Sequence, residues 1–280
     1  MKKGINYWAF IAEDGGSPID PVKAMKIAKD LGYDAFEFTV DNDGPISLSM
    51  TYDKAEKICK EADNIGIELV TLASGLGWGI SPTDPDPIIR DKAVNNYKKM
   101  LEIASWLGIN IILYLPGMVS ANFIPDFIPQ RYDKVDKWAK ESLKKIIESA
   151  EKYNIKIGVE NVWNKYLLSP LEMRDFIDSF KTPLVGSYFD VGNVLLYGHP
   201  EHWIEILGKR IFAVHLKDFK INVGNLDGFV DLLSGDVDYQ AVMNAFRQIG
   251  YDNIFTVEII PAKLGCVEKA IIAMQVIERM

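Results

Sequence analysis

The spacing of hydrophobic residues along this chain changes repeatedly between two periods. Short runs rich in β-branched and aromatic residues, typical of buried strands, alternate with longer segments whose apolar residues recur every three or four positions, typical of amphipathic helices. This alternation predicts βαβ units and a parallel sheet. Eight strands are expected, at residues 3–9, 34–40, 67–73, 110–115, 155–161, 184–190, 211–217 and 253–259.

The helical segments carry recognisable end signals. Several of them finish in Leu-Gly or Ile-Gly directly before the next strand, as at Gly32 and Gly66, where a helix C-cap takes the left-handed conformation. Eight strand–helix units predict one (β/α)₈ TIM barrel of class α/β, with residues 1–280 as a single domain. A doubly wound open sheet is the rival fold, but the first strand-to-helix turn lacks G-x-G-x-x-G.

Two connections are longer than the usual strand-to-helix loop. They are GLGWGISPTDPDP at residues 75–87 and PGMVSANFIPDFIPQ at residues 116–130, and both leave the C-terminal ends of predicted strands. Their glycine, proline and aromatic residues suit lids over a small polar substrate, although long loops are also found as mere elaborations.

The composition indicates what kind of partner to expect. A formal net charge of −8 disfavours nucleic acid and anionic membrane surfaces as partners, and no run of about 18 apolar residues is present. Cys59 and Cys266 are isolated from each other in sequence and are expected to be free thiols. No export signal is recognisable, so we expect a cytoplasmic protein that binds a small molecule.

Four ionisable residues stand at the C-terminal ends of the last four predicted strands, where such barrels carry their chemistry. They are Glu160 in GVENVWNK, Asp190 in SYFDVGN, His215 in AVHLKDF and Glu258 in TVEIIP. Each follows an apolar run, so a charge there is costly unless it is paired or coordinated. Because the four strands are neighbours, the four side chains are predicted to converge.

Three carboxylates and one imidazole form a donor set that suits Mn²⁺ and tolerates Mg²⁺ or Co²⁺. The absence of thiolates in this set argues against structural zinc. A buried carboxylate held by backbone N–H groups or a lysine is the alternative for any single member, but four at one barrel end favour a common metal site. His199 and His202 are a weaker second pair, because Pro200 marks a helix start and no third ligand is near in sequence.

The segments ENVWNKYLLSP, DVGN, HLKDF and VEI, together with the order Glu, Asp, His, Glu, resemble the sugar isomerase/epimerase superfamily with a xylose-isomerase-like barrel. That superfamily includes D-tagatose and D-psicose 3-epimerases and L-xylulose 5-phosphate 3-epimerases, and the resemblance covers essentially the whole chain. It implies one divalent metal held by Glu160, Asp190, His215 and Glu258, and a dimer or tetramer.

The resemblance also implies a reaction. Glu160 and Glu258 would be the catalytic acid/base pair on opposite faces of a ketose, which reacts through a metal-stabilised enediolate. Return of the proton to the opposite face gives 3-epimerisation, whereas return to a different carbon gives aldose–ketose isomerisation.

The chain departs from the free-ketohexose epimerases at several positions. It has Tyr166 where those enzymes carry an acidic residue and Asn193 where they carry a histidine. After the metal histidine those enzymes use a distal arginine, where this chain offers Lys217, Asp218 and Lys220. Either lysine could meet a phosphate or carboxylate, or remain a rim lysine in water. Substrate contacts are therefore expected from Asn193, Lys217 and Lys220, with further candidates at the first two strand ends, Asn6 and Glu37.

Other functions remain open on the same barrel. Lyases that dehydrate inosose-type cyclitols also begin with proton abstraction beside a carbonyl, and a catalytically inactive sugar-binding barrel would keep the same fold. A DNA-repair endonuclease of this fold requires a trinuclear metal cluster and many histidines. Three histidines and an acidic composition disfavour that endonuclease.

Overall fold

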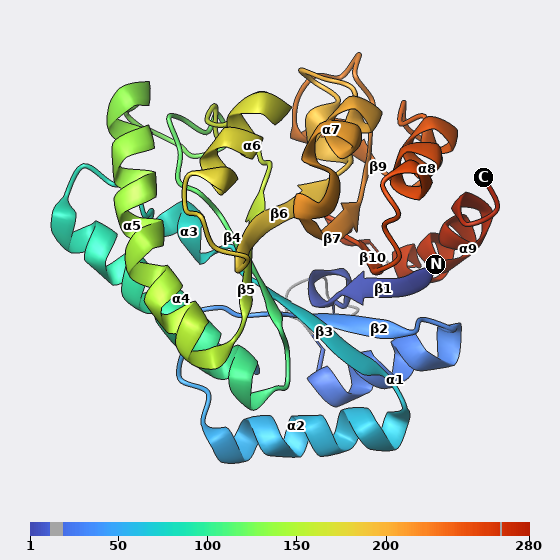
Figure 1. The fold of residues 1–280 in the computed structure, drawn as a ribbon. Coiled ribbons are helices and arrows are strands. Elements are labelled where there is room, and N and C mark those ends of the chain that lie inside the picture. Colours follow the sequence, from blue (N-terminus) through green and yellow to red (C-terminus); the bar gives the residue numbers. More distant parts are fainter. Residues whose placement is uncertain (12–18, 264) are drawn as a thin grey trace.

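The strands close into a barrel of eight parallel strands (Figure 1). The computed structural model describes residues 1–11, 19–263 and 265–280. The barrel strands are β1 (Lys2–Asn6), β2 (Ala35–Thr39), β3 (Glu68–Ala73), β4 (Ile111–Tyr114), β5 (Lys156–Glu160), β6 (Val185–Asp190), β7 (Ile211–Leu216) and β10 (Ile254–Val257). Their order around the barrel is β1, β10, β7, β6, β5, β4, β3, β2, which confirms the predicted (β/α)₈ fold.

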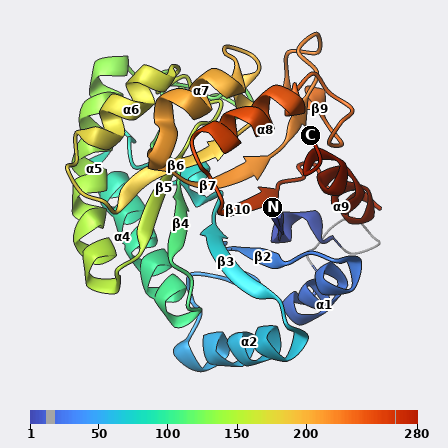
Figure 2. The ribbon, with the colours of Figure 1, turned by 45° about the vertical axis from the view of Figure 1, so that its right-hand side comes forward.

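The helices surround the strands on the outside of the barrel (Figure 2). They are α1 (Pro21–Leu31), α2 (Tyr52–Ile65), α3 (Leu76–Gly79), α4 (Pro87–Trp106), α5 (Tyr132–Tyr153), α6 (Pro170–Asp178), α7 (Pro200–Leu207), α8 (Tyr239–Gln248) and α9 (Cys266–Ile277). The predicted glycine caps are confirmed, since Gly32 has a φ of 97° and Gly66 a φ of 75°. No helix in the described ranges is long and apolar enough to cross a membrane.

The first strand is shorter than the predicted residues 3–9. It ends at Asn6, and Tyr7–Ala9 form a 3₁₀ turn. The Asn6 side chain accepts a hydrogen bond from the backbone N–H of Trp8 at 2.7 Å, which caps this turn and ends the ladder. The prediction was wrong here because the apolar residues YWA look the same in a strand and in a short capped turn.

Strand β2 shows how the barrel separates two environments. All five of its residues are buried. Phe36 and Phe38 pack together outside the strands with the ring of Tyr7, at centroid distances between 5.1 and 5.9 Å. Glu37 contacts Thr71 and Tyr188, residues of strands elsewhere in the barrel. The alternation of side chains along a strand therefore places this acid inside the barrel.

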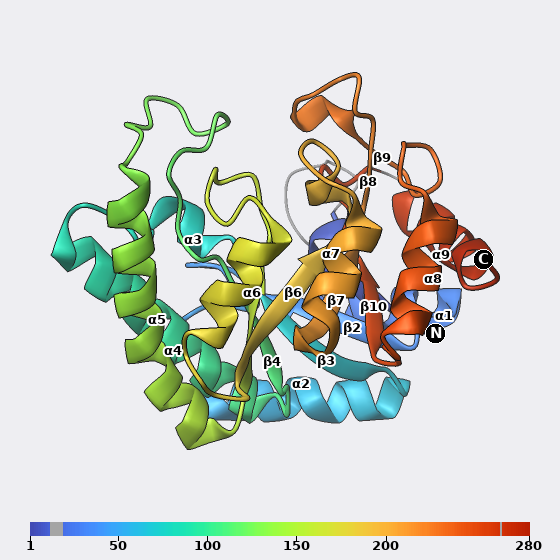
Figure 3. The same cartoon turned by 45° about the horizontal axis from the view of Figure 1, so that its top comes forward.

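Two long segments stand at the C-terminal end of the barrel. One joins β4 to α5, and the other joins β7 to α8 and contains an antiparallel pair, β8 (Asp218–Phe219) and β9 (Phe229–Val230). Figure 3 shows both rising at the same end of the molecule. The sequence pattern did not predict β8 and β9, because strands of two residues leave no detectable period.

The segment after β4 is held by a close contact at Gly117. Gly117 has a φ of 100°, and a Cβ added to it would lie 2.2 Å from Cγ2 of Thr83. The Thr83 hydroxyl accepts a hydrogen bond from the Met118 N–H at 3.0 Å, and Asn164 donates to the Gly117 carbonyl at 2.7 Å. Glycine therefore lets three loops meet at this point.

Gly117→Ala is expected to lower the free energy of unfolding by about 2–4 kcal/mol, because it adds overpacking to a left-handed backbone. Gly44→Ala is the matched control, since Gly44 has a φ of 101° and nothing lies within 4 Å of the added Cβ. The control should cost only about 1–2 kcal/mol. Urea unfolding followed by circular dichroism measures both, and equal losses would contradict the role of the Thr83 contact.

Candidate active site and metal centre

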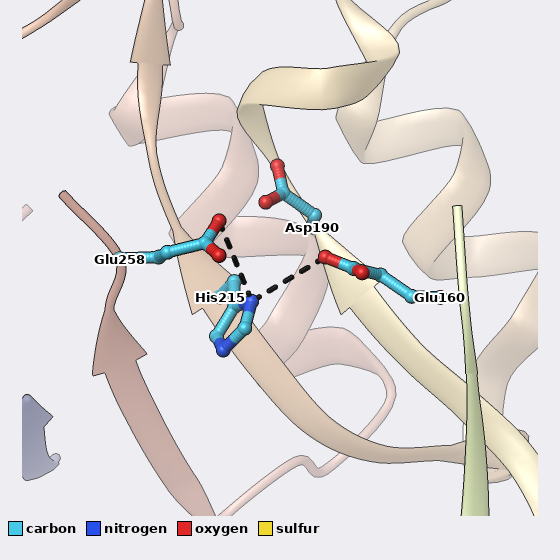
Figure 4. Close-up of side chains that lie close together, drawn as sticks. All are labelled: Glu160, Asp190, His215 and Glu258. Carbon is cyan, nitrogen blue, oxygen red and sulfur yellow. Dashed lines mark ion pairs between the residues drawn. The ribbon is translucent and has the colours of Figure 1, made fainter. Parts of the chain in front are cut away.

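The four predicted ligands converge at the C-terminal end of the barrel. Glu160 and Asp190 end β5 and β6, His215 lies near the end of β7, and Glu258 directly follows β10. These strands are consecutive around the barrel, and Asp190 is in register with His215. One ligand atom from each residue lies within 4.8 Å of those of the others, and all four residues are buried (Figure 4).

His215 presents one ring nitrogen to this cluster. Its Nε2 is 2.8 Å from Oε1 of Glu37, which lies on the opposite side of the ring. Its Nδ1 faces Oε1 of Glu160 at 3.5 Å and Oε2 of Glu258 at 3.8 Å. This Nδ1 is buried and has no hydrogen-bond partner. A proton on Nε2, shared with Glu37, leaves the lone pair of Nδ1 free to bind a metal ion.

Glu37 is itself tightly held. Asn6 and the hydroxyl of Tyr188 donate to its carboxylate, and Thr71 donates to Oε2 at 2.6 Å. Burial raises the pKa of Glu37, but the adjacent His215 and these hydrogen bonds outweigh burial and lower it. Glu37 is therefore a fixed anion that orients the His215 ring.

Asp190 is oriented by two asparagines. Asn161 donates to the Asp190 carbonyl at 2.7 Å and accepts from the Asp190 N–H at 2.9 Å. The backbone N–H of Asn193 donates to Oδ1 of Asp190 at 2.8 Å, while the Asn193 side chain donates to the Asn161 carbonyl at 3.1 Å. Oδ1 of Asp190 thus accepts a hydrogen bond, and Oδ2 of Asp190 is left facing the cluster.

Lys217 provides the positive charge nearest to the carboxylates. Its Nζ lies 3.1 Å from Oδ2 of Asp190 and also contacts Oε2 of Glu258. Burial lowers the pKa of Lys217, but Asp190, Glu258 and Glu160 outweigh it and raise that pKa. The lysine is therefore a buried cation.

Glu160 has the electrostatic environment of a proton-transfer group. Burial is the largest influence and raises its pKa to about 7, with the negative charges of Glu258 and Asp190 acting in the same direction. The nearby ring of His215 opposes this shift. A carboxyl group with a pKa near neutrality can both take up and release a proton.

A cavity of about 650 Å³, called here the inner cavity, lies over Glu160 and Glu258. Its volume is within the range of small-molecule pockets. Trp78 and Phe123 line it, one from each long loop singled out in the sequence. Its other lining residues include Trp8, Ser74, Val162, Trp163, Asn193, Lys217, Leu226, Asp227, Phe229, Pro261 and Lys263. Charged groups therefore form the floor, and aromatic rings form much of the wall.

The remaining predicted residues occupy different positions. Asn193 and Lys217 line the inner cavity, whereas Lys220 is exposed and outside its lining. Asn6 and Glu37 are fully buried and lie behind His215 rather than along the cavity wall. His199 is exposed and pairs with Glu201, and the described residues contain no second group of three or more potential metal ligands.

Several site residues were not anticipated from the sequence. Thr71 is in register with Glu37, and Tyr188 is two positions before Asp190 on the same strand. The alternation of side chains along a strand could have indicated that Thr71 and Tyr188 face the barrel interior. It does so only when the partner strand and its register are known. Trp163 lies in a loop and Phe229 in the two-residue strand β9, so neither position shows a detectable period.

The family described as "Xylose isomerase-like TIM barrel" matches residues 25–276. The chain belongs to this family. A solved D-tagatose 3-epimerase-like protein superposes with a TM-score of 0.79 at 20% identity, covering 100% of this chain and 99% of that one. At this identity the likeness concerns the fold.

Two relatives match most of the length of the present chain. The protein MJ1311 of Methanocaldococcus jannaschii is 24% identical over 267 residues, covering 92% of this chain and 83% of the relative. A protein of Escherichia coli K12, named putative L-ribulose-5-phosphate 3-epimerase SgbU, is 24% identical over 242 residues, covering 84% of this chain and 82% of the relative.

Glu37→Gln is expected to weaken binding of a divalent ion about 10- to 100-fold, because the ring of His215 loses the carboxylate that orients it and holds its tautomer. Isothermal titration with Mn²⁺ measures the affinity, and thermal unfolding checks that the variant is folded. Glu68→Gln is the control, since Glu68 is exposed at the start of β3. Unchanged affinity in folded Glu37→Gln would contradict this role.

Proposed function

We propose that this protein is a metal-dependent isomerase or epimerase of a ketose or ketose phosphate. The observation that carries the proposal is the pair of buried glutamates, Glu160 and Glu258, which approach the cluster from opposite sides at the floor of the inner cavity (Figure 4). Two strands, β6 and β7, separate β5 from β10, so a small substrate between the two carboxyl groups would be reached from two faces. The name of the relative SgbU supports the same class of reaction.

The metal is proposed to be Mn²⁺, with Mg²⁺ or Co²⁺ as alternatives. Glu160, Asp190, His215 and Glu258 would hold it, since three carboxylates and one imidazole suit these ions and Nδ1 of His215 has no other partner. Such an ion supplies Lewis acidity, which polarises a substrate carbonyl and acidifies the neighbouring C–H group.

Proton transfer is assigned to the two glutamates. One carboxylate takes the proton from the carbon beside the carbonyl, and the electron pair of that C–H bond moves into an enediolate. The other glutamate, in its acid form, returns a proton to the opposite face, which inverts the carbon. Delivery to the adjacent carbon instead would give aldose–ketose isomerisation.

The other predicted residues are proposed to assist binding. Lys217 and Asn193 line the inner cavity and would contact substrate oxygens, with the Lys217 ammonium near any oxygen that gains negative charge. Lys220 is exposed, and a phosphate reaching the rim would be its ligand. Asn6 and Glu37 would act through the His215 ring that Glu37 holds.

Incubation with Mn²⁺ and a panel of ketoses in D₂O should place deuterium on a carbon next to the carbonyl of the true substrate. Glu160→Gln and Glu258→Gln should each lower this exchange by about 10²–10⁴-fold, because each removes a group that moves the proton. Nuclear magnetic resonance measures the exchange. Metal content is measured in parallel, so that loss of the ion is separated from loss of the base.

Glu205→Gln is the control, because Glu205 is exposed on α7. Absence of deuterium in every metal-loaded incubation would overturn the proposal, and full exchange in Glu258→Gln would overturn its acid/base role. Loss of water from the substrate, seen by mass spectrometry, would instead indicate the inosose-type lyase. Treatment with a chelator should abolish the exchange, and Mn²⁺ should restore it.

A further inference from the structure

A second cavity adjoins the inner cavity, and we call it the outer chamber. Its volume is about 400 Å³, and it is lined by residues of the β4–α5 and β7–α8 segments and of the loops after β5 and β6. Phe123, Trp163, Leu226 and Asp227 line both spaces. The two cavities are therefore neighbours that share one wall of four residues.

Trp163 is the fixed part of this shared wall. Its indole N–H donates to the Asn193 carbonyl at 2.9 Å, and its ring stacks on Phe229 at a centroid distance of 4.9 Å. Phe219 packs against the same ring edge-on at 5.1 Å. Phe123, on the β4–α5 segment, packs edge-on against Trp78 at 4.9 Å. Aromatic rings therefore line the inner cavity and continue, through Trp163 and Phe123, into the outer chamber.

The outer chamber is apolar with a few hydrogen-bonding groups. Leu168, Leu196 and Tyr197 line it, and each is more than a third exposed. Asn122 and Asn225 add amide groups. Aromatic rings beside amides suit a ring that has apolar C–H faces and hydroxyl edges.

The charges of the outer chamber disfavour a phosphate as its occupant. Lys165 is its one cationic lining residue, and the acidic residue Asp227 lines the same space. Phosphate sites usually gather several cationic or N–H donors without an opposing carboxylate. The inner cavity alone already has the size of a small-molecule pocket, so a monosaccharide has no need of the outer chamber.

We propose that the outer chamber is a second sugar subsite, and that the substrate has two rings. The carbonyl-bearing unit lies over Glu160 and Glu258, and an uncharged sugar ring linked to it by a glycosidic bond stacks in the outer chamber. This proposal rests on the proposed function for the position of the reacting unit. Its test uses binding alone, so it can fail or succeed independently of turnover.

The experiment compares disaccharides that keep a free ketose unit with that ketose alone. Lactulose, turanose, maltulose and palatinose are titrated against D-fructose with the Mn²⁺-loaded full chain, and tryptophan fluorescence reports binding. At least one disaccharide is expected to bind about tenfold or more tightly than D-fructose, because a stacked second ring adds buried contact.

Leu196→Trp tests whether the gain comes from the outer chamber, because it fills a space that Leu196 lines and leaves the inner cavity's lining unchanged. It should remove the preference for the disaccharide without changing binding of D-fructose or Mn²⁺. Leu171→Trp is the matched control, since Leu171 is exposed on α6 and lines neither cavity. Asn122→Ala is a second chamber variant, since Asn122 lines only the outer chamber, and it should reduce the preference by removing an amide.

Several results would overturn the proposal. The proposal is overturned if no disaccharide binds more tightly than D-fructose, including the case in which none binds. It is also overturned if the preference for a disaccharide survives Leu196→Trp. A stronger gain for fructose 6-phosphate that is lost in Lys165→Met would make the chamber a phosphate site. If Leu196→Trp instead dissociates an oligomer in analytical ultracentrifugation and leaves sugar binding unchanged, a second copy of the chain covers this face.

Discussion

Mutual repulsion among buried carboxylates is the constraint on which this site depends. Four of them surround a single imidazole, that of His215, and they are Glu37, Glu160, Asp190 and Glu258. A buried ion without a partner costs several kcal/mol even after relaxation. Hydrogen bonds from three neighbours stabilise Glu37, and the ammonium of Lys217 lies against Asp190 and Glu258. The atoms left without a hydrogen bond include Nδ1 of His215, so a cation is favoured at this point.

The closed barrel is what holds these charges together. Neighbouring parallel strands end at the same level, so β5, β6, β7 and β10 deliver one functional group each to a common point. The hydrogen bonds of the sheet fix the strand ends, and the side chains of Glu37, Asn161 and Asn193 fix the orientation of the ligands. The long loops then provide the aromatic walls above the charged floor. The strands therefore hold the charged residues in place, and the loops shape the entry to the inner cavity.

Much of the fold was predictable because its signals are local. Hydrophobic period and glycine helix ends identified the eight barrel strands, and seven of them agree with the structure to within two residues at each end. The first strand was predicted three residues too long, because the capping interaction between Asn6 and Trp8 competes with an apolar run that suits a strand equally well. The β8–β9 pair was missed because two residues are too few to show a period.

The site residues also divide into those that local sequence signals predict and those that only the fold brings together. Glu160, Asp190, His215 and Glu258 could be chosen from the sequence, because each ends an apolar strand and strand ends of a barrel meet. The contact between His215 and Glu37 spans 178 positions of sequence, and no local pattern indicates it. Nor does any pattern indicate that Lys217 lies between two carboxylates or that Trp163 separates two cavities. The sequence determined which residues reach the end of the barrel, because alternation and chain direction are local properties. Tertiary structure alone decided which of them touch, because contact across a barrel depends on closure, register and loop packing.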